Sequence, residues 1–460
     1  MTSTVPRFIF TKKQGSIVRR CLAEMFSTTC IEPLSLNDLK DFAATDYFAR
    51  RIRFLDDGRE VLFSKQALAA LNRLVDVLDD ATHPDPRFNW SDINTAVRKV
   101  CEQSFKAGLA PENLDELLPL LWDVLRDDIR SRTFVAALEG VKLLGASPLK
   151  LGGLMVSPCA RSVIQDSGVE PRDYLDYPST KGFAESVCIH GTTTGTTDAA
   201  LSWFKEQANL AAAMLAVDAG ANYERAATTF LIEARTDEGS RSSAGALFYW
   251  QTDDTSKYTL SLLGGRPQDL RLTGERVQQL SASATFQHAF DVFQRRERNS
   301  LEEAFVRAVY WYGDAHTDKT PVMQFVKYWS CLECLLGGPG EQLTDTLARN
   351  TVALLVAGPY NILHHDEAAK HVKSVKRLYG LRSKAVHRAA HAHVSHGDIV
   401  QMSTWSALAI TNSLAIIHAG KRSIEALWKE LERISGVLRI SSPEVIPEDD
   451  GRTAAVTKQK

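Results

Sequence analysis

The spacing of apolar residues changes twice along this 460-residue chain, and the spacing limits which secondary structure each part can form. In residues 1–130 apolar side chains recur three and four positions apart, the repeat of an amphipathic helix. Residues 131–295 instead contain short runs of β-branched and aromatic side chains between glycines, prolines and serines, a pattern typical of strands. The helical repeat returns in residues 296–438. We therefore expect an α+β protein that is predominantly α, with an N-terminal helical region, a middle α+β region and a C-terminal all-α bundle.

Composition narrows the possible partners and the compartment. The chain has 54 Lys+Arg against 56 Asp+Glu, so nucleic acid could be bound only through a local basic patch. Seven cysteines, an odd number in a long chain, argue against a disulfide scaffold and favour a reducing compartment. Neither the apolar core of a signal peptide nor an apolar stretch of about 20 residues is present. We expect a cytoplasmic protein without a membrane partner, ending in a flexible, charged tail at residues 439–460.

The middle region should contain several short strands. They are predicted at residues 133–138, 141–144, 149–156, 183–190, 228–234 and 246–251, with a helix at about 198–219. The stretch Gly191-Thr-Thr-Thr-Gly195-Thr-Thr stands where a phosphate-binding loop could lie. That loop needs a lysine after its last glycine, and Thr196 stands there, so we interpret the stretch as an ordinary loop before the helix.

The C-terminal region should be a helical bundle. Ser300 and Glu303 have the spacing of a capping box in front of an amphipathic run. Further helices are predicted at about residues 320–336, 342–357, 366–378, 382–393, 398–419 and 422–435.

A basic and histidine-rich stretch lies within this region. Seven of the chain's 12 histidines fall between residues 364 and 396, and residues 368–397 contain no aspartate or glutamate. Such a run can be a solvated helix face, but those faces normally mix both signs, so the stretch favours an anionic partner. The cations that we expect to bind RNA are Lys373, Lys376, Arg377, Lys384 and Arg388.

An arginine and a histidine stand five positions apart in this stretch. Leu378, Leu381 and Ala385, with Ala389 and Ala392, form one helical stripe that should pack on the bundle. His387 is about 200° from Ala385 on the helix, so it should point away from that stripe, on a face shared with Ser383 and His391. Arginine offers a planar fork of donors for a phosphate, and histidine exchanges a proton near neutral pH. This pair suits cleavage of RNA, whose own 2′-hydroxyl can act as the nucleophile without a metal.

The segment Arg382-Ser383-Lys384-Ala385-Val386-His387 resembles the R-x4–6-H motif of HEPN domains. Its setting, from Leu378 to His387, is similar to the ApeA-like branch, and Tyr328–Leu336 is similar to that branch's first long helix, which carries a Leu-Glu pair. The resemblance covers about residues 298–437. It implies a homodimeric, metal-independent endoribonuclease without a cofactor, commonly a toxin-like effector of phage defence that answers an infection-derived trigger. Arg382 would contact the phosphate, His387 would be the acid or base, and Ser383 is the polar residue after the arginine.

The sequence leaves alternatives open. Arg388 follows His387 where many relatives have glycine, so a larger cation could help to bind phosphate or could crowd the site. Glu333 could orient Arg382 by a charge-assisted bond, or it could be a surface carboxylate. His387 and His391 have the spacing of a helical metal-ligand pair, but no carboxylate lies among the neighbouring histidines and we expect no metal. A catalytically silent HEPN-like module for RNA binding or dimerisation remains the alternative function.

Overall fold

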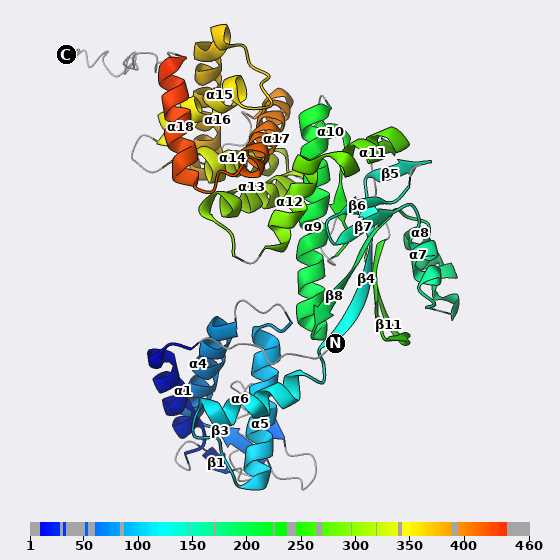
Figure 1. Ribbon diagram of the computed structural model, residues 1–460, viewed down its shortest axis with the longest axis vertical. Coiled ribbons are helices and arrows are strands. Elements are labelled where there is room, and N and C mark those ends of the chain that lie inside the picture. Colours follow the sequence, from blue (N-terminus) through cyan, green and yellow to red (C-terminus); the bar gives the residue numbers. More distant parts are fainter. Residues whose placement is uncertain are drawn as a thin grey trace, which may run out of the picture. The chain divides into compact units, whose positions relative to one another are not determined.

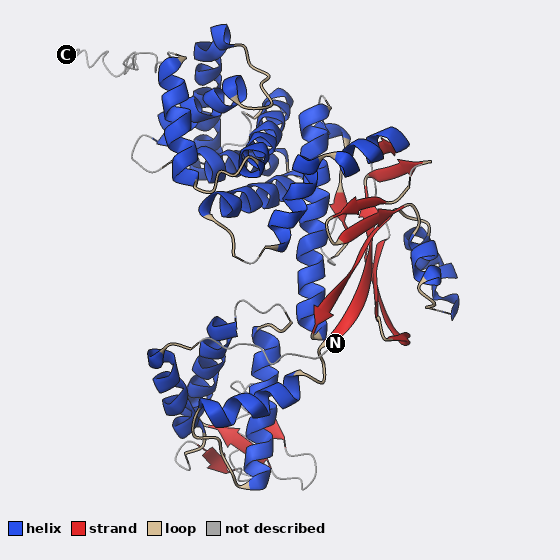
Figure 2. Cartoon of the chain, viewed as in Figure 1, coloured by secondary structure: helices blue, strands red, loops and turns tan. Residues whose placement is uncertain are grey.

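The fold is described by a computed structural model (Figure 1). It describes residues 10–27, 31–33, 51–53, 60–82, 87–145, 147–169, 172–223, 226–236, 245–263, 269–295, 297–318, 320–338, 343–388 and 394–438. The described chain is α+β and predominantly α, as the spacing of apolar residues predicts (Figure 2). It forms two compact units, each built from three segments of the chain. The first unit contains residues 1–137, 153–208 and 235–265, and the second contains the remainder.

The N-terminal part of the first unit is helical with a small sheet. Its elements are α1 (Lys12–Met25), β1 (Ile31–Pro33), β2 (Arg51–Arg53), β3 (Glu60–Phe63), α4 (Lys65–Thr82), α5 (Trp90–Ala107) and α6 (Leu114–Leu125). The antiparallel sheet has the order β1-β3-β2, which the helical spacing did not predict. Apolar faces of the four helices share one core, in which Leu71, Leu74, Val97 and Leu121 are at most 1% exposed.

The rest of the first unit is an antiparallel sheet with short helices. The strands, in spatial order, are β11 (Asp254–Leu263), β10 (Gly245–Gln251), β4 (Arg130–Glu139), β8 (Cys188–Gly195) and β7 (Leu154–Ser157). The helical segments are α7 (Ala160–Asp166), η1 (Arg172–Asp176), α8 (Pro178–Ala184) and the first part of α9 (Thr197–Asn222). Phe183 and Phe248 are fully buried in the core between sheet and short helices.

Four predictions for the middle region were wrong in part, the first of them the strand expected at residues 149–156, which is divided into two strands, Leu149–Leu151 and Leu154–Ser157. The strand expected at residues 183–190 begins only at Cys188, because Pro178 starts helix α8 and this helix buries Phe183. The supposed loop from Gly191 to Gly195 continues strand β8 and pairs with β4 from Phe134 to Arg130. Residues 228–234 hold the end of a short helix, α10 (Ala226–Thr229), and only a two-residue strand, β9 (Glu233–Ala234).

The second unit begins with small pieces of sheet. Strand β5 (Val141–Leu144) pairs in parallel with β12 (Leu270–Thr273), the end of β4 pairs with β9, and β6 spans Leu149–Leu151. The end of α9, α10, α11 (Gly274–Ala282) and α12 (Ala284–Gln294) follow in this unit.

The C-terminal bundle forms most of the second unit. It contains α13 (Ser300–Thr317), α14 (Pro321–Leu336), α15 (Leu343–Ala357), η2 (His365–Glu367), α16 (Ala368–Arg388), α17 (His396–His418) and α18 (Ile424–Val437). Helix α14 packs on α13, α15, α16 and α17, and its Trp329 and Tyr328 are fully buried. The bundle therefore has α14 near its centre (Figure 1).

Two details of the bundle differ from expectation. The capping box at α13 is formed by Asn299 and Glu302, one residue earlier than predicted. Ser300 instead accepts a hydrogen bond from the backbone N–H of Ile424, at 3.1 Å, and so joins α13 to the start of α18. The two helices expected at 366–378 and 382–393 are one helix that runs through Gly380 to Arg388.

Among the helices in the described ranges, none combines the length and the apolar character needed to cross a bilayer.

Candidate active site

Helix α16 carries the residues expected to form the site. Its buried residues Val372, Val375, Leu378 and Ala385 lie on one stripe, and this stripe packs on α14 and α15. Because the stripe continues past Gly380, packing keeps the helix continuous where the local sequence suggested a break. The prediction that Leu378 and Ala385 face the bundle is confirmed; Ala389 and Ala392 lie outside the described residues.

Arg382 on α16 forms an ion pair with Glu333 on α14. Its Nη2 donates to Glu333 Oε2 over 3.2 Å, and the two side chains are 21% and 23% exposed. Arg382 Nε is buried, and no described residue accepts its hydrogen. The orienting contact considered for Glu333 is therefore present. Its effect is to hold a guanidinium in one place at a partly solvated position, with N–H groups left over for another acceptor.

The end of α14 that carries Glu333 is fixed by three neighbouring helices. Trp428 of α18 donates to the carbonyl of Leu335 over 2.9 Å, and Asn350 of α15 donates to the carbonyl of Leu336 over 3.0 Å. Near Arg382 in the sequence, Tyr379 of α16 packs against Trp329 of α14, with 5.6 Å between the two ring centroids. The two hydrogen bonds satisfy carbonyls that a helix end otherwise leaves without partners. They therefore fix the end of α14 that carries Glu333.

The other motif residues follow Arg382 on the same helix. Ser383 is half-buried. His387 lies on the same helix five residues after Arg382, which is about 7.5 Å along the helix axis. The side chains of His387 and Arg388, and all of His391, lie outside the described residues. The helix therefore places the Arg382 and His387 backbones on one rigid element, and the geometry of the imidazole stays a prediction.

Two of the five cations expected to bind RNA have carboxylate partners on neighbouring elements. Lys376 Nζ lies 2.7 Å from Asp345 Oδ1 of α15, and Arg377 Nη2 lies 2.6 Å from Asp398 Oδ1 of α17. Lys373 and Lys384 are exposed. A stretch without acidic residues in sequence is thus partly neutralised in space, which the local composition could not reveal.

Asp398 has two structural roles that sequence reasoning missed. It closes the capping box of α17 with Ser395, and it binds Arg377 on α16. Burial alone would raise the pKa of this carboxyl, but the hydrogen bonds from Arg377 and Ser395 outweigh it and lower the pKa. The Ser-x-x-Asp spacing at residues 395–398 is the signal that could have found the cap.

The cysteines and histidines of the described chain do not gather into a metal centre. Within the described ranges, no group of three or more His, Cys, Asp or Glu side chains has a geometry that could hold an ion. Cys331 is fully buried on α14 and Cys334 is partly buried, and both are free thiols. Burial raises the pKa of Cys331, so this thiol stays protonated and is a poor metal ligand or nucleophile.

Comparison with protein-family models, with curated proteins and with solved structures gives no significant match for this chain.

Proposed function

We propose that the C-terminal bundle is a metal-independent endoribonuclease of HEPN type that acts as a homodimer. In this proposal Arg382 binds the scissile phosphate, His387 exchanges the proton, and Ser383 lines the site. The proposal extends to a role as a toxin-like effector in phage defence, with the middle region receiving an infection-derived trigger.

The proposed reaction needs only groups of the protein and the RNA. A base removes the proton of the 2′-hydroxyl, whose oxygen then attacks the adjacent phosphorus. The bond from phosphorus to the 5′-oxygen breaks, and an acid protonates this leaving oxygen, which yields a 2′,3′-cyclic phosphate and a free 5′-hydroxyl. Two imidazoles are needed for the acid and base roles, and two copies of α16 in a dimer would supply them. DNA lacks the 2′-hydroxyl and should not be cleaved.

The observation that carries the proposal is the ion pair between Arg382 and Glu333. An arginine whose charge served only solubility would extend into water, whereas this guanidinium is held against α14 and only about one fifth exposed. A preorganised cation stabilises the charge that develops on a phosphate without reorganisation during the reaction. His387 follows on the same helix at the spacing of the motif.

A second function is favoured by the neighbouring ion pairs. Lys376 and Arg377 are bound by Asp345 and Asp398, and the same logic makes Arg382–Glu333 a link between helices rather than a phosphate clamp. The bundle would then be a catalytically silent HEPN-like module for RNA binding or dimerisation. The two functions differ in whether the protein cleaves RNA and whether the cleavage depends on His387.

The test compares RNA cleavage by full-length wild type, His387→Ala and Arg382→Lys, each in EDTA. Loss of a general acid or base should lower the rate about 10²- to 10⁴-fold. Replacing the planar fork of Arg382 by a single ammonium should lower it about 10²- to 10³-fold. His365→Ala is the matched control, because His365 is a strongly exposed histidine just before α16. It should cleave like the wild type.

Product analysis and folding controls decide between the two functions. Equal melting curves for all four proteins and a 2′,3′-cyclic phosphate product are expected. No cleavage by any of the four proteins while RNA binding persists would establish the silent module instead, and cleavage by His387→Ala at the wild-type rate would contradict the catalytic role of His387.

A further inference from the structure

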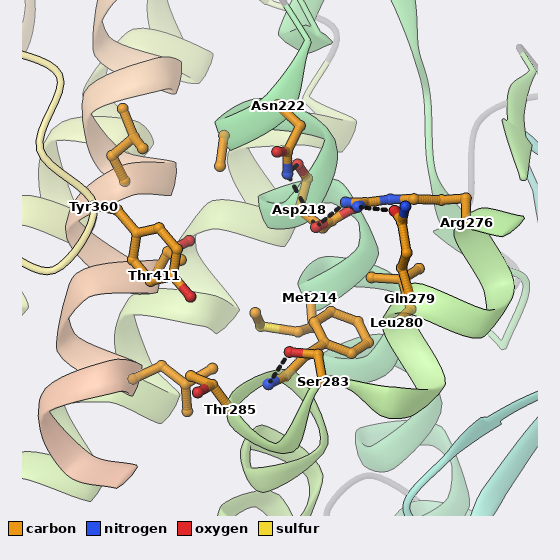
Figure 3. Close-up of a pocket in the computed structure, with 14 residues that line it drawn as sticks. Met214, Asp218, Asn222, Arg276, Gln279, Leu280, Ser283, Thr285, Tyr360 and Thr411 are labelled. Carbon is orange, nitrogen blue, oxygen red and sulfur yellow. Dashed lines mark hydrogen bonds and ion pairs between the residues drawn. The ribbon is translucent and has the colours of Figure 1, made fainter. Parts of the chain in front are cut away.

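The second unit contains a cavity of about 210 Å³ that is separate from Arg382 and His387. The end of α9 forms one wall, the junction of α11 and α12 forms the next, and α17 with Tyr360 forms the third (Figure 3). Met214, Leu280, Leu408 and Leu414 give it a buried, apolar lining.

An ion pair forms the polar wall of the cavity. Asp218 on α9 accepts from Nη2 of Arg276 on α11 with both carboxylate oxygens, at 2.6 and 2.7 Å. Asn222 donates to Asp218 Oδ1 over 3.1 Å, and Arg276 Nη1 donates to Gln279 over 3.2 Å. The side chains of Asp218 and Arg276 are only 12% and 24% exposed. Burial raises the pKa of Asp218, although the bond and charge of Arg276 oppose this effect.

The ion pair is not saturated. Arg276 Nε is buried and has no acceptor among the described residues, which is a costly arrangement in an apolar environment. A carboxylate also has about four lone-pair positions, more than the bonds to Asp218 use. Both Asp218 and Arg276 line the cavity, so the wall places a carboxylate and a guanidinium side by side next to a molecule in it.

An aromatic ring stands across the cavity from this wall. Tyr360 lies opposite Asp218 and Arg276, next to Thr411 (Figure 3). Tyr360 is 45% exposed, but its backbone is held on both sides by Asn412 of α17, which is fully buried. Asn412 Oδ1 accepts from the Tyr360 N–H over 2.8 Å, and its Nδ2 donates to the Tyr360 carbonyl over 3.1 Å. The ring is thus presented on a fixed backbone at the mouth of the cavity.

Charge and size restrict the ligand. A further anion would meet the carboxylate of Asp218 and a further cation would meet Arg276, so the neutral pair favours an uncharged molecule. The volume is below the roughly 300–1,000 Å³ of pockets for drug-sized ligands, which suits a single ring system. An apolar lining, an exposed tyrosine face and an adjacent donor and acceptor together fit a flat heterocycle with polar edges.

We propose that this cavity binds an uncharged nucleobase, its ring stacked on Tyr360 and its edge hydrogen-bonded to Asp218 and Arg276. The base could belong to a free nucleoside or to an RNA strand. The neutral pair and the small volume favour the free nucleoside, because a strand would bring phosphates close to Asp218. This binding does not depend on the nuclease proposal.

The test is calorimetric titration of full-length protein with adenosine, guanosine, cytidine and uridine, each also as its 5′-monophosphate. At least one nucleoside should bind, and it should bind more tightly than its monophosphate. Tyr360→Ala should weaken binding about 5- to 150-fold, the range expected for loss of one base–aromatic stack, whereas Tyr360→Phe should keep the affinity. Tyr310→Ala, which removes a 60% exposed tyrosine of α13, is the matched control and should bind like the wild type.

A second variant tests the polar wall. Asp218→Asn leaves the charge of Arg276 unopposed. The ligand preference of this variant should therefore move from the nucleoside toward the monophosphate. Melting curves check that the variant folds. Competition with a short uncleavable RNA separates the two sources of the base: displacement of the nucleoside would point to a strand. The proposal fails if no nucleoside binds at millimolar concentration, or if Tyr360→Ala binds as tightly as the wild type.

Discussion

His316 on α13 is 1% exposed and lies beside two tyrosines. Its ring stacks with Tyr312 at 6.3 Å, and its Nδ1 lies 3.5 Å from the hydroxyl of Tyr328, while no described residue bonds to its Nε2. Burial lowers the pKa of His316 from 6.5 to about 4. The folded protein therefore holds this imidazole neutral at a pH where an unfolded chain would protonate it.

This difference predicts how stability depends on pH. Between pH 6.5 and about 4 the unfolded chain binds a proton at His316 that the folded chain does not, so the free energy of unfolding falls with falling pH. Over this pH range His316 lowers the free energy of unfolding by about 3 kcal/mol in total. Urea unfolding of wild type and His316→Gln at several pH values should show the steeper decline in the wild type.

Other groups titrate in the same window, but they are shared by both proteins. Burial lowers the pKa of His190 and His288 as well, and their contributions cancel in the difference between wild type and variant. Parallel stability curves from pH 7 to pH 4 would show that His316 is protonated in the folded state.

At the scale of the helix, α16 is weakened by a glycine that its packing does not require. A Cβ added to Gly380 would meet no atom within 4 Å, and the residue lies in the middle of the helix. Gly380→Ala should therefore raise the free energy of unfolding by about 0.5–1 kcal/mol, since it removes backbone freedom from the unfolded chain.

Gly220 of α9 is the matched opposite case. A Cβ there would collide with the hydroxyl of Tyr312 and approach Ala407 of α17, so Gly220→Ala should lower the free energy of unfolding by about 1–3 kcal/mol. Thermal melting of both variants beside the wild type measures the two effects. Destabilisation by Gly380→Ala would mean that α16 bends at residue 380, as its local sequence suggested.

Sequence predicted elements well where the apolar repeat was long, and less well where pairing came from far along the chain. Helix α14 begins within one residue of its predicted start, and strand β5 has its predicted bounds. Residues 191–195 looked like a loop because their partner, Arg130–Phe134 of β4, lies some sixty residues earlier. A strand that is completed by a distant partner leaves little trace in its own sequence.

The same limit applies to the candidate site. Contact with Arg382 is one of the two alternatives that the sequence leaves for Glu333, and this contact is present. The partners of Lys376 and Arg377 could not, because Asp345 and Asp398 belong to other helices whose approach only the packed bundle defines.

For the whole molecule, the proposed reaction requires association of two copies. Val386, directly before His387, is an apolar side chain that is 47% exposed on α16, as expected for a residue that a second copy covers. Val386→Glu should therefore weaken a homodimer at least tenfold and reduce cleavage in parallel, measured by light scattering and by specific activity over a dilution series. Val437→Glu, at a 69% exposed valine on α18, should change neither.

Constant specific activity on dilution, in a protein that scatters light as a monomer, would contradict the composite site. A dimer that Val386→Glu leaves intact would place the interface elsewhere on the bundle.

The division of each unit among three segments has a consequence for how the protein is made. Strand β5 leaves the ribosome well before its partner β12, more than a hundred residues later, and synthesis advances at about 5–20 residues per second. The second unit therefore cannot close until translation has passed residue 266. Neither unit is encoded by one continuous stretch of the gene. A recombination event that transferred a single segment of a unit would omit the residues of its core that belong to the other two segments. A gene fragment starting at residue 296 would lose Gly220 and the helix that packs against Tyr312.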